Sequence, residues 1–174
     1  MGKVMKLFGN VGDEKMNNDK IKKNLIVLSK MIIFFINDSK QRIYKTKLNK
    51  LLFYAQFLCY KTYGVRLLDF EFIKENHGPV LECLDSYLDM LNKVEIIQFI
   101  KTDYGLTIET SINISKNEYS IEEYDILNKV TNKFRTYTAV DISNYSHKES
   151  LWLNTDFKET IEIKRADELN ELFI

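Results

Sequence analysis

The spacing of apolar positions predicts two long amphipathic helices in the first third of the chain. From about Asp19 to Ile36, apolar residues recur every three or four positions, which places them on one face of a helix. Asp19 is a suitable N-cap residue for this helix. The same period runs from Thr46 to Tyr63, and Gly64 then follows where helices often end in the left-handed conformation. The apolar faces are Ile21, Leu25, Leu28, Ile32 and Phe35 in the first helix, and Leu48, Leu51, Leu52, Ala55, Leu58 and Cys59 in the second.

The middle of the chain mixes extended and helical patterns. Residues 69–74 alternate partly, which favours a short extended segment. Pro79 stands where the first residue of a third helix is expected, because proline there loses no helical hydrogen bond. Residues 95–101 and 106–110 are rich in isoleucine and threonine, and the segment between them ends in Tyr-Gly. This pattern predicts a β-hairpin with a four-residue loop. The apolar face of the third helix is Val80, Leu84, Tyr87, Leu88 and Leu91.

The last third of the chain predicts further helices. The sequence Ser-Ile-Glu-Glu from Ser120 is a capping box, and it opens a fourth helix that extends to about Tyr137. A short helix is expected over residues 138–146, and a last helix from Arg165 to Phe173. About five or six helices are therefore expected in total.

These elements predict an α+β fold, mostly helical, with a small antiparallel β-hairpin or sheet. A chain of 174 residues favours a single domain. Six glycines and one proline are too few for a β-sandwich with many turns. Residues 1–19 show no apolar period and contain three glycines, so they are predicted to be a flexible N-terminal arm. The folded domain is assigned to residues 20–174.

The charges balance overall but are distributed unevenly. Residues 1–50 carry a net charge of +8, and residues 51–174 carry −8. A basic excess can mark a nucleic-acid or membrane surface, but it also arises where lysines keep helices solvated. Only four of the 25 basic residues are arginine, the preferred reader of phosphates and base edges, so the solvated interpretation is favoured. The longest apolar run, Met31–Ile36, is too short to span a bilayer, and we expect no membrane partner and a cytoplasmic protein.

Motifs for catalysis, metals or cofactors are scarce. The glycines form no phosphate-binding loop. The spacing of Cys59, His77, Cys83 and His147 matches no zinc pattern. A Cys–His nucleophile pair would need an open polar setting, whereas both cysteines lie in Leu-rich helical patterns that predict buried, inert thiols. We therefore expect no enzyme, no metal and no cofactor.

Three segments are unusual in combination. Residues 47–56 read KLNKLLFYAQ, residues 75–80 read ENHGPV, and residues 141–152 contain Asp-Ile-Ser, Ser-His-Lys-Glu and a tryptophan. In this order and spacing, the set resembles the Panacea domain family, which includes SocA-like antitoxins and phage-associated GepA-like proteins. The resemblance covers about residues 20–174. The chain departs from the family pattern at His77, where a tyrosine usually precedes Gly-Pro.

The resemblance implies an antitoxin-like protein of a type II toxin–antitoxin system that neutralises a toxin by direct binding. Family members usually act on a toxin encoded beside them, so the implied partner is the protein toxin of the adjacent gene. At least one SocA-type member delivers its toxin to a bacterial protease as an adaptor, which is an alternative role with a protease complex as second partner. A nucleic-acid-binding regulator is the alternative from another class, and the basic residues 1–50 are its only support.

The motifs supply seven candidate partner-binding residues: Lys47, Lys50, Tyr54, Gln56, His77, His147 and Trp152. Lys47 and Lys50 are three positions apart, which predicts that they share an exposed side of the helix. Tyr54 follows Lys50 by four positions, so its ring can lie along the lysine stem. Tyr54 can equally be a core aromatic residue, and Gln56 can cap nearby backbone.

The other three candidates also admit two interpretations. His77 can titrate near neutral pH or simply bond to backbone. His147 precedes Trp152 by five positions at the expected end of a helix. The apolar neighbours of Trp152 predict that its ring is buried in the core, whereas a solvent-facing tryptophan would be a candidate hot spot of an interface.

Overall fold

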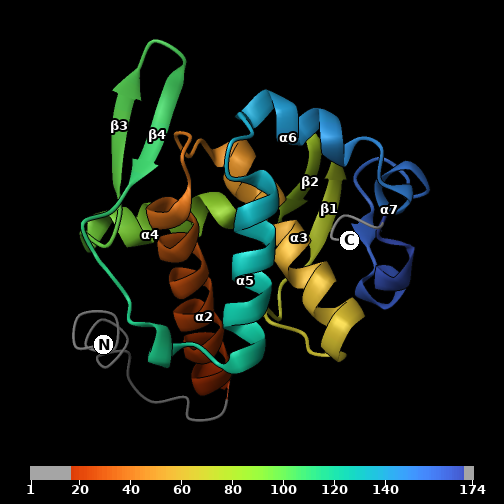
Figure 1. The fold of residues 1–174 in the computed structure, drawn as a ribbon, viewed down its shortest axis with the longest axis horizontal. Coiled ribbons are helices and arrows are strands. Elements are labelled where there is room, and N and C mark those ends of the chain that lie inside the picture. Colours follow the sequence, from red (N-terminus) through yellow and green to blue (C-terminus); the bar gives the residue numbers. More distant parts are fainter. Residues whose placement is uncertain (1–16, 171–174) are drawn as a thin grey trace.

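The computed structural model describes residues 17–170 of the chain. It is a mostly helical α+β domain with two small antiparallel sheets, which confirms the fold predicted from the sequence (Figure 1). Most of the predicted arm, residues 1–19, lies outside the described residues, and its last three residues belong to helix α2. The elements are α2 (Asn17–Asp38), α3 (Lys45–Tyr63), β1 (Phe72–Glu75), β2 (Gly78–Leu81), α4 (Leu84–Lys93), β3 (Gln98–Thr102), β4 (Gly105–Glu109), the 3-10 helix η1 (Lys116–Glu118), α5 (Ile121–Phe134), α6 (Ala139–Ser146), α7 (Ser150–Leu153), β5 (Thr160–Ile161) and the 3-10 helix η2 (Ile163–Glu168).

Helix α3 lies at the centre of the fold, between α2, α5 and the β1–β2 hairpin (Figure 1). It also contacts α6, β4 and η2. Every residue from Lys47 to Cys59 is buried, although the run includes lysines, an asparagine and a glutamine. A helix enclosed on every side offers no face to solvent, so each polar side chain in this run needs a partner inside the protein.

Strands β1 and β2 form a hairpin with a two-residue turn at 76–77, and β5 pairs with the other side of β1. The prediction that Pro79 begins a helix is wrong, because this residue lies in β2 opposite Lys74. Proline has no N–H to donate, and it is tolerated here because β2 is an edge strand. Helix α4 begins only at Leu84, after Cys83 has adopted a positive φ of 58°.

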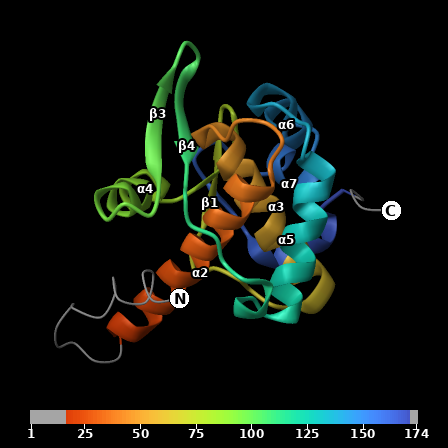
Figure 2. The same cartoon turned by 60° about the vertical axis from the view of Figure 1, so that its left-hand side comes forward.

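The hairpin predicted in the middle of the chain is confirmed as β3–β4, and it projects beyond the helical body (Figure 2). The last pair of its ladder is Thr102 with Gly105, so the turn has two residues, 103–104, rather than the four expected. At the base of the hairpin, the N–H of Ile108 donates to the carbonyl oxygen of Ile43 at 2.8 Å. The hairpin is thereby anchored to the segment that connects α2 with α3.

Both C-terminal helices begin with reciprocal side-chain caps. Ser120 and Glu123 form the capping box predicted for α5, and Thr138 and Asp141 form another at the start of α6. The helix expected from Arg165 to Phe173 is wrong in type, since the described part of this segment is the end of the 3-10 helix η2. None of the helices formed by residues 17–170 combines the length and hydrophobicity needed to cross a membrane.

Candidate functional site

Four of the seven candidate residues lie on α3, and all four are buried. Lys47, Lys50, Tyr54 and Gln56 are each at most 1% exposed. The expectation of an exposed lysine face is therefore wrong, because the enclosed helix has no solvated side. The ring of Tyr54 stacks on Phe134 with 4.7 Å between ring centroids, so the core interpretation of this residue is the one that holds.

Lys50, Gly78 and Ser146 bring the three sequence motifs into contact. Lys50 Nζ donates a hydrogen bond to the carbonyl oxygen of Pro79 at 3.1 Å. A Cβ atom on Gly78 would lie 2.6 Å from Lys50 Cε and 2.4 Å from Ser146 Oγ, so a larger residue has no room there. Gly78 also has a φ of 95°, a conformation that glycine adopts without strain. The β1–β2 hairpin thus packs directly against α3 and α6.

Two amide side chains of α3 hold neighbouring backbone segments in place. The N–H of Leu81 donates to Asn49 Oδ1 at 2.8 Å, where β2 ends. Gln56 forms two bonds with Leu68, because its Nε2 donates to the carbonyl oxygen at 2.7 Å and its Oε1 accepts from the N–H at 2.9 Å. These bonds satisfy backbone groups that are buried away from water. Asn49 was not among the sequence candidates, although its place inside the first motif was an available signal.

The buried carboxylate of Glu149 lies beside Tyr54, the tyrosine of the first motif. Tyr54 donates its hydroxyl proton to Glu149 Oε1 at 3.1 Å, and Glu149 Oε2 accepts from the N–H of Asn170 at 2.9 Å. Burial raises the pKa of Glu149, and burial together with the nearby carboxylate raises the pKa of Tyr54 well above its usual value. Glu149 lies within the third motif, and the residue pattern alone predicts no role for it. The structure shows that it ties α3 to the C-terminal segment.

The two buried lysines sit in settings that disfavour their charged forms. Lys47 Nζ donates to Ser39 Oγ at 2.9 Å, and the carboxylate of Asp141 lies near enough to stabilise its charge. Burial lowers the pKa of Lys47 to about 8, and Asp141 opposes this shift. Burial also lowers the pKa of Lys50 to about 8. Both side chains thus act as internal hydrogen-bond donors rather than as surface charges.

The other three candidates meet where the β1–β2 hairpin turns. Ser143 Oγ donates to the carbonyl oxygen of His77 at 2.9 Å, which leaves the exposed His77 side chain on a fixed turn. Trp152 Nε1 donates to the carbonyl oxygen of Glu75 at 3.2 Å. Its ring is half-buried, so the prediction of a core tryptophan is wrong.

A stacked pair of rings forms the wall beside this turn. His147 stacks on Trp152 with 4.5 Å between ring centroids, and Lys74 Nζ lies 4.4 Å from the centroid of the Trp152 ring. Burial, followed by the charge of Lys50, lowers the pKa of His147, while a hydrogen bond to the backbone of Asn76 opposes the shift. His147 is therefore neutral near pH 7. We call Lys74, Asn76, His77, His147 and Trp152 the hairpin-tip surface.

A scan against family models matches residues 48–153 of this chain to the antitoxin SocA-like, Panacea domain. The matched segment holds the hydrogen-bonding partners that join α3, the β1–β2 hairpin and α6. The chain belongs to the SocA-like Panacea domain family. The resemblance stated from the three motifs is thereby confirmed, and with it a general antitoxin-like role with a protein partner. Comparisons with curated proteins and with solved structures gave no match.

The cysteines of this Panacea domain differ in setting. Cys59 is buried as expected, and burial followed by nearby carboxylates raises the pKa of its thiol to about 12, which makes it unreactive. The same expectation is wrong for Cys83, which is exposed. The helical pattern around Cys83 was misleading because this residue precedes α4 and stands outside its apolar face.

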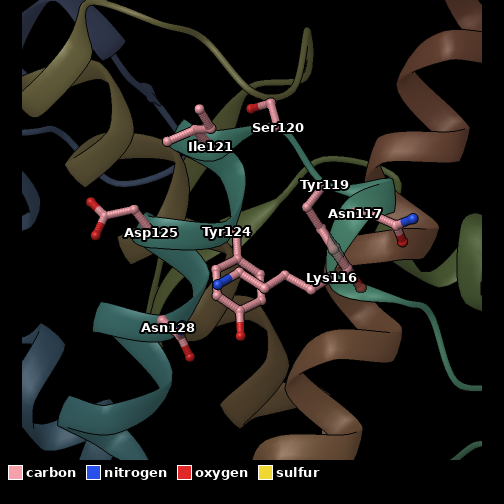
Figure 3. Close-up of a pocket in the computed structure, with 8 residues that line it drawn as sticks. All are labelled: Lys116, Asn117, Tyr119, Ser120, Ile121, Tyr124, Asp125 and Asn128. Atoms are coloured by element: carbon pink, nitrogen blue, oxygen red, sulfur yellow. The ribbon is translucent and has the colours of Figure 1, made fainter.

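A cavity of about 610 Å³ lies between η1 and the start of α5 (Figure 3). Figure 3 shows the Lys116 ammonium in front of the Tyr124 ring, at 4.5 Å from its centroid. Asp125 is paired with Lys129 and also accepts the hydroxyl of Tyr63. The charged side chains of this Panacea domain cavity, Lys116 and Asp125, therefore have contacts within the fold.

Proposed function

We propose that this Panacea domain is the antitoxin of a type II toxin–antitoxin system and neutralises a protein toxin by direct binding. The toxin is the product of the adjacent gene, and the complex forms in the cytoplasm. Residues of all three family motifs meet at the β1–β2 hairpin, and this convergence is the main support for the proposal. The family match supports the antitoxin-like role, and the geometry suggests where the contact is made.

The hydrogen bonds around the hairpin favour a binding role. Lys50, Asn49 and Ser143 each bond to its backbone, so the turn that carries His77 is held in one conformation before a partner arrives. A preformed surface loses little conformational entropy on binding, and more of the contact energy then appears as affinity.

The composition of the hairpin-tip surface also suits a protein contact. Trp152 and His147 present a stacked aromatic pair, and Lys74 adds a cation against the same ring. Aromatic residues with a polar handle are enriched among interface hot spots. The polar groups of the buried motif residues Lys50, Tyr54 and Gln56 are engaged in internal hydrogen bonds, so these residues support the fold beneath the surface that we propose as the contact.

Co-expression with the adjacent gene tests the proposal. We expect the full chain to restore growth of cells that make the toxin, and the two proteins to purify together. His77→Ala and Trp152→Ala should weaken the complex, whereas Ile121→Ala should not. Ile121 is a suitable control because it is 84% exposed on the first turn of α5. Growth rescue without any complex, or a harmless neighbouring gene product, would contradict the proposal.

A further inference from the structure

A second surface lies beside the projecting β3–β4 hairpin, whereas the hairpin-tip surface belongs to the β1–β2 hairpin. A groove of about 870 Å³ is bounded by residues 40–44, by Tyr104 at the hairpin turn, and by residues 138–140 at the start of α6. We call it the hairpin groove. In Figures 1 and 2 the β4 side of the hairpin stands next to the connection between α2 and α3, with α6 beyond it. Its volume exceeds that of the cavity of about 610 Å³ between η1 and α5.

The rim of the hairpin groove is basic. Lys40 and Arg42 are both exposed, and the described residues provide neither side chain with an ion-pair partner. No acidic residue is among those that line the groove. The nearby Asp141 carboxylate caps α6 and stabilises the charge of the buried Lys47. The acidic residue of the hairpin turn itself is Asp103, which is one charge against two.

The local charge pattern accounts for part of the basic excess of residues 1–50. Lys47 and Lys50 are buried, Lys30 pairs with Glu123, and Lys45 pairs with Asp85. Among the described residues of this segment, Lys22, Lys23, Lys40 and Arg42 remain without such a partner, and Lys40 and Arg42 stand together on the short connection between α2 and α3. Part of the excess thus appears at the surface as a local cationic rim.

The walls of the hairpin groove are apolar. Tyr104 is 87% exposed at the tip of the hairpin, and Val140 is 66% exposed on the facing turn of α6. The ring of Tyr44 and the methyl group of Ala139 also line the groove. Large apolar side chains gathered around a hollow indicate an interaction site more strongly than the same residues scattered over a surface.

We propose that the hairpin groove binds an acidic segment of the partner protein that also carries aromatic or aliphatic side chains. Carboxylates of the segment pair with Lys40 and Arg42, and its apolar side chains pack between Tyr104 and Val140. Charge complementarity selects this occupant, because a cationic rim over apolar walls repels a basic segment and leaves a purely polar one without packing. This proposal rests on the proposed antitoxin function, and it adds a contact separate from the hairpin-tip surface.

A defined peptide tests the groove without requiring the partner. The probe is a peptide of about twelve residues in which Asp and Glu alternate with Phe and Tyr. Its controls are a peptide with Lys in place of Asp and Glu, and a single-stranded DNA of similar length. We expect the acidic peptide alone to bind the full chain, with an affinity that falls as salt is added. No binding of the acidic peptide, or tighter binding of the DNA, overturns the proposal.

Charge reversal locates the peptide. In Lys40→Glu/Arg42→Glu, affinity for the acidic peptide should fall about ten-fold or more, since a like-charge rim repels carboxylates. The matched control is Lys22→Glu/Lys23→Glu, which makes the same change of charge on α2 away from the groove. Tyr104→Ser should weaken binding without altering the melting temperature. Equal losses in both double variants would show that only net charge matters, and would overturn the proposal.

The partner itself separates this inference from the proposed function. If the adjacent gene product binds the wild type but binds Lys40→Glu/Arg42→Glu equally well, the antitoxin function stands and the groove is not its contact. The gene product could instead bind neither the wild type nor the double variant, while the acidic peptide still binds the groove of the wild type. In that case the toxin assignment fails, and the preference of the groove for acidic segments stands. A loss of affinity for the gene product that is confined to Lys40→Glu/Arg42→Glu supports both the antitoxin function and the groove as a contact.

Discussion

The ammonium of Lys50 is buried and donates a hydrogen bond to the carbonyl oxygen of Pro79, at 3.1 Å. The first two family motifs thus meet through Lys50, whose position on a helix was predicted from the sequence, and Pro79, whose position in a strand was not. The bond fixes β2 against α3. It also puts a group with a lowered pKa at the junction on which the hairpin-tip surface depends.

The lowered pKa of Lys50 predicts a pH-dependent stability. Its pKa is about 8 in the folded protein and 10.5 when unperturbed, so the unfolded chain binds more protons between these values. The free energy of unfolding should therefore rise as pH increases from 8 to 10.5. Each pKa unit corresponds to about 1.4 kcal/mol, which gives a contribution of about 3 kcal/mol.

Lys50→Met isolates this contribution. In denaturant unfolding from pH 7.5 upward, the free energy of unfolding should rise more steeply for the wild type than for the variant. The variant keeps the contribution of Lys47, whose pKa is also lowered to about 8, and the effects of the tyrosines are common to both proteins. Parallel pH profiles would contradict the assignment. Lys50→Glu should instead lower stability at all pH values by about 3 kcal/mol or more, because it buries an unpaired charge beside a carbonyl oxygen.

Gly78→Ala should destabilise the protein more than Gly64→Ala does. Both glycines have positive φ, at 95° and 66°, so both substitutions carry backbone strain of about 1 kcal/mol. Only at Gly78 does the added Cβ collide with side chains, whereas no described atom lies within 4 Å of it at Gly64. We expect a further loss of about 1–3 kcal/mol for Gly78→Ala. Thermal or urea unfolding of the pair measures the difference, and equal losses would show that the hairpin can move away from α3.

Tyr54→Phe should cost about 1–3 kcal/mol, because it removes one of the two donors to the buried Glu149 carboxylate. Glu149→Gln keeps an acceptor and removes the charge, so Tyr54→Phe should cost less in that background. A double-mutant cycle by urea unfolding at neutral pH measures the coupling between the residues. Additive effects would mean that the hydrogen bond contributes nothing specific.

Trp152→Ala should affect binding more than folding. The ring is half-buried and one side is in contact with His147, so the expected loss of stability is about 1–2 kcal/mol, below the 3–5 kcal/mol typical of a buried aromatic. Melting curves give the stability, and titration with the adjacent gene product gives the affinity. A large loss of stability with unchanged affinity of the folded fraction would remove Trp152 from the proposed contact.

Short-range patterns in the sequence are enough to predict the local features of this protein. The apolar period identified α2, α3 and α5, the capping box fixed the start of α5, and the β3–β4 hairpin followed from two Ile- and Thr-rich segments around a turn. The three motifs were enough to indicate the family. These features were accessible because helix faces, caps and short hairpins depend on residues within a few positions of one another.

Which residues face solvent depends on how distant segments pack together. Local pattern predicted an exposed lysine face on α3, but β2 and α6 pack against Lys50 from segments more than 20 positions away, and Lys50 is buried as a result. The same reason explains Pro79, whose place in a strand depends on pairing with β1, and the half-burial of Trp152. The hairpin groove likewise joins three segments far apart in the chain. Burial of a polar side chain depends on partners that only the folded chain supplies, and a periodicity analysis contains no information about them.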